Sequence, residues 1–281
     1  MSRVRIVTDS ACDLPDSIAA ELGIEIVPLT IRFGDTEYTD RVDLTPTQFW
    51  AKCAASPVLP STAAPSPGAF EAVFRSLAAD GATGIVCINL SAGLSATMQS
   101  AELAARAVGD QIEVRVIDSA SVTIGLGMIC VDCARLADDG ASIDVIEARA
   151  RDLASRTHVW GALDTLENLK KGGRIGGAKA LVASVLSIKP IIEVVNGKVE
   201  EGGKQRTRAK ALSFLIDQVT AAGEIENLAV MHAACPDVDQ FVAKLRPLSP
   251  TGDIVVGDIG AVIGAHAGQG TIGVVFQSKR S

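Results

Sequence analysis

Short apolar runs that end in hydroxyl-bearing side chains recur along the first half of this chain. Thr8-Asp9-Ser10 ends the first run, and Ser91-Ala92-Gly93-Leu94-Ser95 follows the apolar segment Gly84–Leu90. Asp118-Ser119 follows a further apolar segment, Ile112–Ile117. In a parallel α/β sheet these positions are the carboxyl ends of strands, where ligands bind and helix N-termini present free N–H groups. Because no general base accompanies the hydroxyls, the pattern predicts a cleft that holds a carboxylate or phosphate.

The length and composition favour two aliphatic cores. A chain of 281 residues exceeds one typical domain, and we place the boundary between domains of residues 1–156 and 157–281. Hydrophobic residues make up 48% of the chain but aromatic residues only 4%, so the interior must consist mainly of Val, Ile, Leu and Ala. Buried parallel strands have this composition.

Charge, cysteine and histidine exclude several classes of protein. The net charge of −7 is dispersed and no basic cluster stands out, which argues against nucleic-acid binding. Six scattered cysteines are typical of buried thiols in a reducing compartment, and with three histidines they form no metal-binding pattern. We therefore expect no metal and no cofactor. Asp9 comes too early for a signal peptide, which favours a cytoplasmic protein.

One long segment, Ile259–Ser278, lacks Lys, Arg, Asp and Glu and so invites comparison with a membrane span. Five glycines and several polar residues interrupt it, so we expect no stable membrane insertion but buried strands around a glycine loop.

Gly268-Gln-Gly270-Thr-Ile-Gly273 matches the dinucleotide-binding fingerprint, but a strand follows where that motif needs a helix. The spacing therefore predicts a tight glycine turn between strands.

The first half alternates strands with helices. Strands are predicted at Val4–Thr8, Ile24–Leu29, Ile31–Phe33, Gly84–Leu90 and Ile112–Ile117. Helices are predicted at Asp16–Leu22, after Thr45-Pro46 and Ser66-Pro67, and at Leu94–Val108, Val122–Leu136 and Ile143–Ser155. Strand–helix–strand crossovers place strands parallel, so this half predicts a mainly parallel, Rossmann-like α/β sheet.

The second half has a different order of predicted strands and helices. Asn196-Gly197 predicts a type I′ hairpin that joins Pro190–Val195 to Lys198–Glu200. Further strands are predicted at Val159–Leu163, Leu228–His232, Ile254–Val256 and Gly273–Phe276, and helices at Thr165–Lys171, Ala178–Ile188, Thr207–Ala222 and Val238–Leu245. A hairpin combined with crossovers predicts a C-terminal α/β domain with a mixed sheet.

The residues predict no catalytic centre. Ala92-Gly93-Leu94-Ser95 is half of a nucleophile elbow, and no Ser–His–Asp set follows from the spacing. Asp9 and Asp118 fit the bracing of strand-end loops better than an acid–base pair. The glycine-rich segment around Arg174 lacks the Lys of a phosphate loop and fits a helix stop as well as an anion site. His266 stands alone in uncharged surroundings.

The order of the motifs along the chain is more specific than any one motif. The first half contains Thr8-Asp9-Ser10, Ser61-Thr62-Ala63-Ala64-Pro65-Ser66-Pro67, Ser91-Ala-Gly93-Leu94-Ser95 and Asp118-Ser119. The second half adds Gly172-Gly173-Arg174-Ile175, Ile188-Lys189-Pro190-Ile191, Arg206-Thr207-Arg208 and Gly264-Ala-His266-Ala-Gly268-Gln-Gly270. Along nearly the whole chain this series resembles the DegV family of bacterial fatty-acid-binding proteins.

The resemblance implies a two-domain α/β protein that buries one long-chain fatty acid. It also implies a partner, a dihydroxyacetone-kinase-like fatty acid kinase that phosphorylates the bound carboxylate with ATP. The chain itself would then be a carrier of acyl phosphate and no enzyme. By position in the motifs, Thr62 and Ser95 are implied to hold the carboxylate, and Arg174 and His266 to contact the head group or its phosphate. The supporting loops would contain Thr8, Asp9, Ser10, Ser61, Gly93, Leu94, Asp118 and Ser119.

The sequence departs from the family pattern at one segment, and other functions stay open. Ala63 and Ala64 stand where Ser and Gln are usual, which removes a hydroxyl and an amide beside the expected head group.

The main alternative to a fatty acid carrier is an enzyme that acts on a small carboxylated or phosphorylated metabolite, with His266 as its acid–base group. A lipid-sensing protein is another. An aliphatic interior suits an acyl tail, because burying each CH2 contributes about 0.8 kcal/mol.

Overall fold

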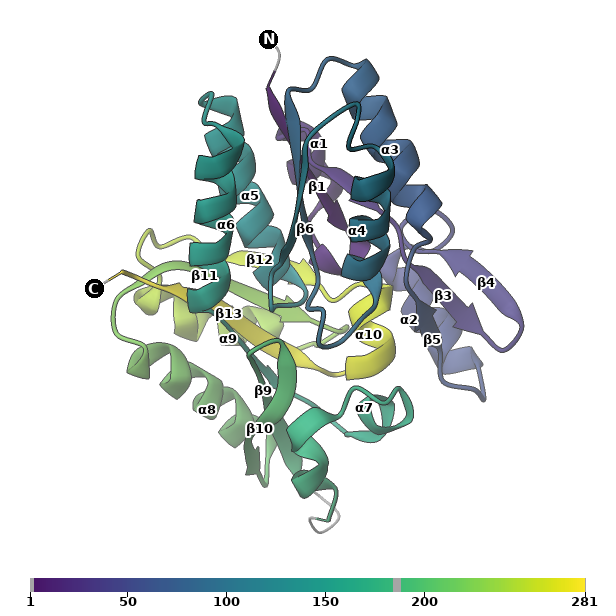
Figure 1. The fold of residues 1–281 in the computed structure, drawn as a ribbon. Helices are drawn as coiled ribbons and strands as arrows, with labels where there is room; N and C mark the ends of the chain where they lie inside the picture. Colours follow the sequence, from purple (N-terminus) through teal and green to yellow (C-terminus); the bar gives the residue numbers. More distant parts are fainter. Residues whose placement is uncertain (1–2, 184–187, 281) are drawn as a thin grey trace.

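The structure is a computed structural model that describes residues 3–183 and 188–280. It is an α/β protein with one parallel sheet, one mixed sheet and a small antiparallel sheet (Figure 1). All strands of the parallel sheet lie before residue 119, and all strands of the mixed sheet lie after residue 156. The sequence-based prediction of a parallel α/β half followed by a mixed α/β half is confirmed.

The parallel sheet has the strand order β2-β1-β6-β7. Its strands are β1 (Val4–Asp9), β2 (Glu25–Val27), β6 (Gly84–Asn89) and β7 (Val114–Asp118). The 3-10 helix η1 (Ser10–Cys12) follows β1 directly, and the connecting helices are α1 (Asp16–Glu21), α3 (Pro67–Ala79), α4 (Thr97–Ala107), α5 (Ile124–Asp138) and α6 (Ile143–Arg156). Every described residue of β6 is buried, as expected for a central strand covered on both faces.

The antiparallel sheet, of order β4-β3-β5, lies beside the parallel sheet together with α2 (Figure 1). It consists of β3 (Thr30–Phe33), β4 (Thr36–Thr39) and β5 (Ser61–Ala63), and α2 spans Pro46–Ala55. Thr45 and Gln48 form a capping box at the start of α2, the helix that was predicted after Thr45-Pro46. The sequence analysis placed no strand at β5, because three residues are too few to show alternation.

The mixed sheet has the order β10-β9-β8-β13-β11-β12, in which only the β11–β12 pair is parallel. Its strands are β8 (Thr157–Ala162), β9 (Lys189–Val195), β10 (Lys198–Gln205), β11 (Ile225–His232), β12 (Val255–Asp258) and β13 (Ile272–Ser278). Its helices are α7 (Glu167–Lys171), η2 (Gly176–Ala183), α8 (Arg208–Ala221), α9 (Val238–Leu245), η3 (Arg246–Leu248) and α10 (Ala261–Ala267). Asn196 and Gly197 both have positive φ, which confirms the predicted type I′ hairpin.

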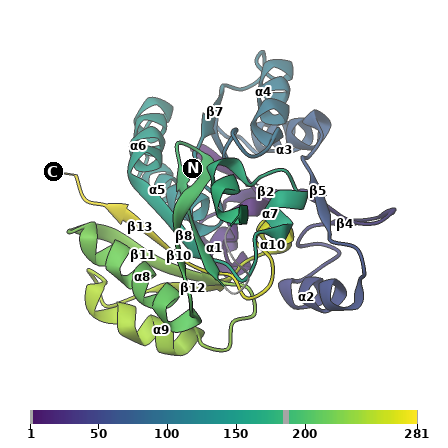
Figure 2. The ribbon, with the colours of Figure 1, turned by 90° about the horizontal axis from the view of Figure 1, so that it is seen from below.

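Helices and sheets alternate in layers. Helices α3 and α4 cover one face of the parallel sheet through Phe70, Phe74 and Ala101. Helices α5 and α6 lie between the parallel sheet and the mixed sheet, whereas α8 and α9 cover the outer face of the mixed sheet (Figure 2). The central core is shared, since Ile129 of α5 belongs to the same apolar cluster as Val275 of β13. The two halves therefore meet through a continuous apolar layer.

One prediction in the second half is wrong, and another is confirmed only over the residues that the structure describes. Segment Ala261–Ala267 was expected to contribute to buried strands but forms helix α10, so the glycine turn at 268–271 joins a helix to a strand. A short uncharged run does not separate the two structures by period, and its three alanines favour the helix. The helix expected at Ala178–Ile188 is present as far as Ala183, as the 3-10 helix η2. Residues 184–187 of that prediction lie outside the described part of the chain.

Candidate functional site

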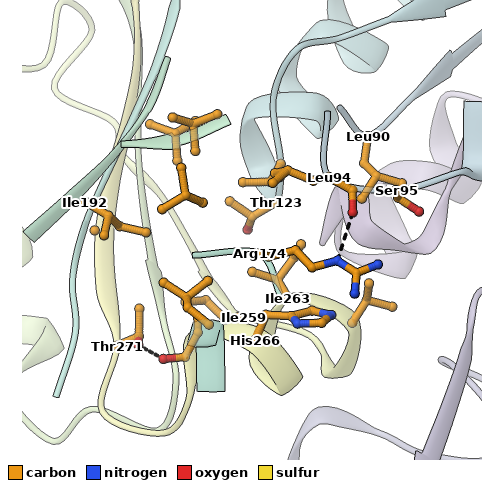
Figure 3. A pocket seen from close by; sticks show the side chains of 18 of the residues that line it. Leu90, Leu94, Ser95, Thr123, Arg174, Ile192, Ile259, Ile263, His266 and Thr271 are labelled. Carbon is orange, nitrogen blue, oxygen red and sulfur yellow. Dashed lines mark hydrogen bonds between the residues drawn. The ribbon is translucent and has the colours of Figure 1, made fainter. Parts of the chain in front are cut away.

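A cavity with a volume of about 110 Å³ lies between the inner face of the mixed sheet, helix α10 and the loops that follow β6 and β7 (Figure 3). Most of its lining side chains are aliphatic. They are Leu29, Leu90, Leu94, Val122, Val159, Leu163, Leu169, Ile192, Val194, Val199, Ile259, Val262, Ile263 and Ala267. The lining also contains Thr62, Ser95, Thr123, Gly161, Arg174, His266 and Thr271.

The four residues that were expected to hold the head group all line this cavity. Thr62 comes from β5, Ser95 from the loop after β6, Arg174 from the loop after α7, and His266 from α10. They therefore reach one cavity from four separate segments. The structure brings them together, whereas the contact that each would make with a ligand stays a prediction.

His266 is held by a hydrogen bond and by close packing. Its Nε2 lies 2.9 Å from Oγ1 of Thr62, while its buried Nδ1 has no hydrogen-bond partner in the described structure. A side chain at Gly172 would clash with this ring nitrogen, so glycine is required there. Burial, with a smaller contribution from the positive charge of Arg174, lowers the pKa of His266 to about 4. The imidazole is consequently neutral at pH 7 and offers one donor and one acceptor.

Helix α10, which carries His266, packs tightly against α2. A Cβ added at Gly264 would lie 2.8 Å from Cη2 of Trp50 and 2.9 Å from Cε1 of Phe49. The N-terminus of α10 is tied to the first half as well, because the Gly260 N–H donates to Oδ1 of Asp13 at 3.1 Å. These contacts fix the position of His266 relative to β5.

Arg174 supplies a positive charge without a paired carboxylate. Its Nε donates to the carbonyl oxygen of Leu94 at 3.1 Å, and its Nη1 donates to that of Gly172 at 2.6 Å. The side chain forms no ion pair with a carboxylate in residues 3–183 or 188–280, and Nη2 has no hydrogen-bond partner among those residues. A half-buried guanidinium with a free N–H group favours an anionic ligand.

Ser95 lies where β6 gives way to α4. Its Oγ is 2.9 Å from Oγ1 of Thr97 and accepts a hydrogen bond from the Thr97 N–H at 3.3 Å. Leu94 beside it lines the cavity and accepts the bond from Arg174. This loop therefore contributes both a hydroxyl and a carbonyl at the polar end of the cavity.

Most of the predicted supporting residues do not line the cavity but shape the loops around it. Asp9 accepts hydrogen bonds from the N–H groups of Ala11 and Leu90 and from the amide of Asn89. Burial nevertheless raises the pKa of Asp9 to about 6. Asp118 accepts from the backbone of Ala92 and Ala120. Both aspartates brace strand-end loops, as expected, and neither faces the other as an acid–base pair.

The remaining supporting residues also lie outside the lining of the cavity. Ser10 Oγ accepts from the Leu29 N–H, and Ser119 Oγ exchanges hydrogen bonds with the backbone of Ser121. Thr8 is completely buried, and Ser61 is exposed at the start of β5. Gly93 packs against the β9–β10 hairpin, where an added Cβ would lie 2.6 Å from the carbonyl oxygen of Gly197.

Several lining residues were missed by the sequence analysis. Val159, Gly161 and Leu163 alternate along and just beyond β8, so their side-chain positions share the face that looks into the cavity. Their period of two was visible, but the same pattern describes an ordinary core strand. The hydroxyls of Thr123 and Thr271 also line the cavity, but both already donate, to Asp13 and to the carbonyl of Ala267.

The described part of the chain contains neither a metal-binding group of three or more His, Cys, Asp or Glu side chains nor a helix long and apolar enough to cross a bilayer. The lining of the cavity includes no Asp or Glu among the residues that the structure describes. Its polar end thus combines hydroxyls, a neutral imidazole and one guanidinium.

Comparison with known proteins assigns the family. The model of the DegV family, described as an uncharacterised protein family, matches residues 3–279. The chain belongs to the DegV family. A DegV domain-containing protein of Streptomyces coelicolor is 38% identical over 99% of this chain and 100% of the relative. A DegV domain-containing protein of Mycobacterium tuberculosis is 34% identical over 96% of each chain.

Solved structures of fatty-acid-binding proteins share the whole fold. A DegV family protein from Thermus thermophilus, described by its fatty acid binding, has a TM-score of 0.89 at 33% identity and covers 99% of this chain and 100% of its own. DegV from Bacillus subtilis, described as a fatty acid binding protein, has a TM-score of 0.88 at 27% identity with coverage of 99% and 100%. A stearic acid-binding protein from Eubacterium ventriosum has a TM-score of 0.87 at 26% identity and covers 99% of each chain.

Proposed function

We propose that this protein binds one long-chain fatty acid, with the carboxylate at the polar end of the cavity and the tail along its aliphatic walls. The observation that carries the proposal is Arg174, a guanidinium without an ion pair in the described structure, which shares an otherwise aliphatic cavity with Thr62, Ser95 and His266. The fatty acid binding of the DegV family protein from Thermus thermophilus and of the stearic acid-binding protein from Eubacterium ventriosum supports the same ligand class.

The chemistry of the lining suits such a ligand. A carboxylate in a cavity needs donors and a positive charge to replace its hydration, and hydroxyls with one guanidinium supply both. Each CH2 of the tail that contacts the aliphatic walls contributes about 0.8 kcal/mol. The cavity volume of about 110 Å³ is below the range of about 300–1,000 Å³ that is common for ligand pockets. Binding a long tail therefore requires lining side chains to shift outward.

The protein acts as a carrier in this proposal. A partner acyl kinase of the dihydroxyacetone-kinase-like type would transfer the γ-phosphoryl group of ATP to the bound carboxylate, which yields acyl phosphate and ADP. The described lining contains no Asp or Glu, and the pKa of His266 near 4 makes its imidazole a weak base at pH 7. The cavity is thus better suited to holding a carboxylate than to catalysis by His266, which was the main alternative.

Two measurements test the proposal. Native mass spectrometry of the purified protein, before and after organic extraction, should show one copurified fatty acid per chain and uptake of added palmitate or oleate after extraction. The lipid-loaded protein should then be incubated with the kinase and ATP, which should yield acyl phosphate only when all three components are present. Failure to carry or take up any fatty acid contradicts lipid binding, whereas lipid binding without acyl phosphate contradicts only the carrier role.

A further inference from the structure

Gly161 creates a hollow in the sheet wall of the cavity. It sits in β8 directly opposite Ile192 of β9 on one side and Gly273 of β13 on the other, and Gly273 is opposite Met231 of β11. Residues that are directly opposite in a sheet share a face, so the row Ile192–Gly161–Gly273–Met231 lacks side chains at its two central positions. The adjacent row on the same face has none of these gaps, since it reads Val194–Val159–Val275–Ala229.

Glycine occupies positions 161 and 273 of this row for different reasons. A Cβ at Gly273 would lie 2.7 Å from the carbonyl oxygen of Trp160, so the backbone itself forbids a side chain there. A Cβ at Gly161 would lie 3.5 Å from Cδ1 of Leu163 and 3.6 Å from Cγ1 of Ile192, which are ordinary contacts. Gly161 also has no positive φ. Neither its backbone conformation nor its neighbours require glycine.

Glycine in the middle of a strand lowers the stability of the fold, so we look for a role that compensates for this loss. It destabilises a strand relative to Ala because the unfolded chain is more flexible and because no side chain packs. Gly161 is the one glycine among the described residues that line the cavity. A strand glycine without a backbone requirement commonly marks a place where a ligand approaches the sheet closely.

The hollow lies at the tail end of the cavity. Figure 3 shows Ile192, the cross-strand neighbour of Gly161, on the side of the cavity away from Ser95 and the Arg174 guanidinium. A carboxylate held at Arg174 would therefore direct its tail toward β8 and β9. Because the cavity has a volume of only about 110 Å³, a few added carbon atoms at this position would remove much of the space for the tail.

We propose that Gly161 is a specificity-determining residue, whose missing side chain lets the cavity accept the distal carbons of a long acyl chain. This inference rests on the proposed fatty acid binding. Side chains of increasing size at position 161 shorten the longest chain that fits, and they leave the contacts of the carboxylate unchanged.

The test compares Gly161→Ala and Gly161→Val with the wild type and with Gly109→Val. Gly109 is exposed after α4, and a Cβ there meets nothing closer than 3.6 Å, so this variant makes the same chemical change outside the cavity. Dissociation constants for laurate, myristate, palmitate and stearate are measured on delipidated protein by isothermal titration calorimetry. Thermal unfolding of each delipidated variant is measured in parallel.

Gly161→Val should weaken the binding of stearate and palmitate by about tenfold or more, which corresponds to about two CH2 groups left unburied. Laurate binding should change by less than about threefold by the same reasoning. Gly161→Ala should give a smaller shift in the same direction, and Gly109→Val should keep the wild-type profile. The melting temperature of delipidated Gly161→Ala should equal or exceed that of the wild type, because the added methyl fills a hollow and favours the strand.

The outcomes separate this inference from the proposed function. If the wild type binds fatty acids but both Gly161 variants keep its chain-length profile, Gly161 has no role in specificity and lipid binding stands. A uniform loss of affinity for all four ligands, with a lowered melting temperature in Gly161→Ala, assigns Gly161 a structural role and overturns the inference. If the wild type binds none of the four fatty acids, the proposed function fails, and the role of Gly161 fails with it.

Discussion

The side chains of Thr62 and His266 are joined at 2.9 Å although 204 positions separate them in the chain. Thr62 lies in β5, which pairs with β3 through the register of Thr62 with Ile31, and His266 lies in α10. The bond thus connects the small antiparallel sheet of the first half to a helix that follows β12 of the mixed sheet. The polar end of the cavity exists only because these two parts of the fold meet.

Removing a hydroxyl from this polar end should weaken carboxylate binding. Thr62→Ala or Ser95→Ala removes one hydrogen bond to a charged group, which is worth about 1.5–3 kcal/mol, so the dissociation constant for palmitate should rise about 10- to 150-fold. Ser66→Ala, which removes a hydroxyl that caps α3, is the matched control and should leave palmitate binding unchanged. Titration calorimetry on delipidated protein provides the measurement. Equal affinities for Thr62→Ala, Ser95→Ala and the wild type would remove both hydroxyls from the site.

Arg174 should discriminate acids from alcohols. Arg174→Gln removes the positive charge, and we expect palmitate affinity to fall by at least about tenfold because the carboxylate loses its charged donor. Hexadecanol has the same tail without a charge, so its affinity should change little. Arg174→Lys should restore part of the palmitate affinity, since it keeps the charge but not the planar donor geometry. A parallel loss of acid and alcohol binding would show that Arg174 acts only on cavity shape.

The neutral His266 should make the delipidated protein sensitive to acid. Its pKa is about 4 in the folded protein and near 6.5 when exposed, so the unfolded chain binds the proton first as the pH falls. The stability contribution of neutral His266 is complete above pH 6.5 and decreases between about pH 6.5 and 4, by up to about 3 kcal/mol. Urea unfolding at several pH values should show this decrease in the wild type but not in His266→Gln.

The difference between the two proteins isolates His266 from other buried groups. Burial raises the pKa of Asp9 and of Asp40 to about 6, so these carboxyls favour the folded state at low pH and oppose the effect of His266. Both carboxyls are present in the wild type and in His266→Gln. Identical pH dependence of unfolding in the two proteins would contradict a buried neutral imidazole.

Asp9 should matter for folding more than for binding. Asp9→Ala leaves the N–H groups of Ala11 and Leu90 and the amide of Asn89 without their acceptor, and each buried unpaired donor costs about 1–3 kcal/mol. We expect the free energy of unfolding to fall by about 2–5 kcal/mol, and palmitate affinity of the folded fraction to change less than about threefold. Asp118→Ala should cost less, because its loop is more exposed. An affinity loss as large as that of Arg174→Gln would place Asp9 in the binding site.

Glycine at position 172 should be needed for the head-group site although it has no side chain. Any Cβ there would clash with Nδ1 of His266, so Gly172→Ala should displace the imidazole and break its bond to Thr62. Palmitate affinity should then fall about as far as in Thr62→Ala. Gly173→Ala is a poor control, because Gly173 has φ of +72°, whereas Gly109→Ala changes an open site and should have no effect. Wild-type affinity in Gly172→Ala would show that the imidazole position does not matter for binding.

Most strands and helices could be predicted from the sequence, and so could four residues that line the polar end of the cavity. Apolar runs with strand–helix alternation, the capping box at Thr45 and the hairpin at Asn196-Gly197 are local signals, and local signals are read within a few residues. The motif series that resembles the DegV family placed Thr62, Ser95, Arg174 and His266 in one expected site, and all four line one cavity.

Which apolar residues line the cavity depends on the tertiary structure. Val159 lines the cavity whereas Val275, its neighbour across the sheet, does not, although both are strand valines of the central apolar cluster with the same local pattern. Helix α10 and the pairing of β5 with β3 were likewise missed, because short segments take their conformation from what they pack against. The cavity depends on contacts between segments far apart in the chain, and hydrophobic periodicity does not encode distance between segments.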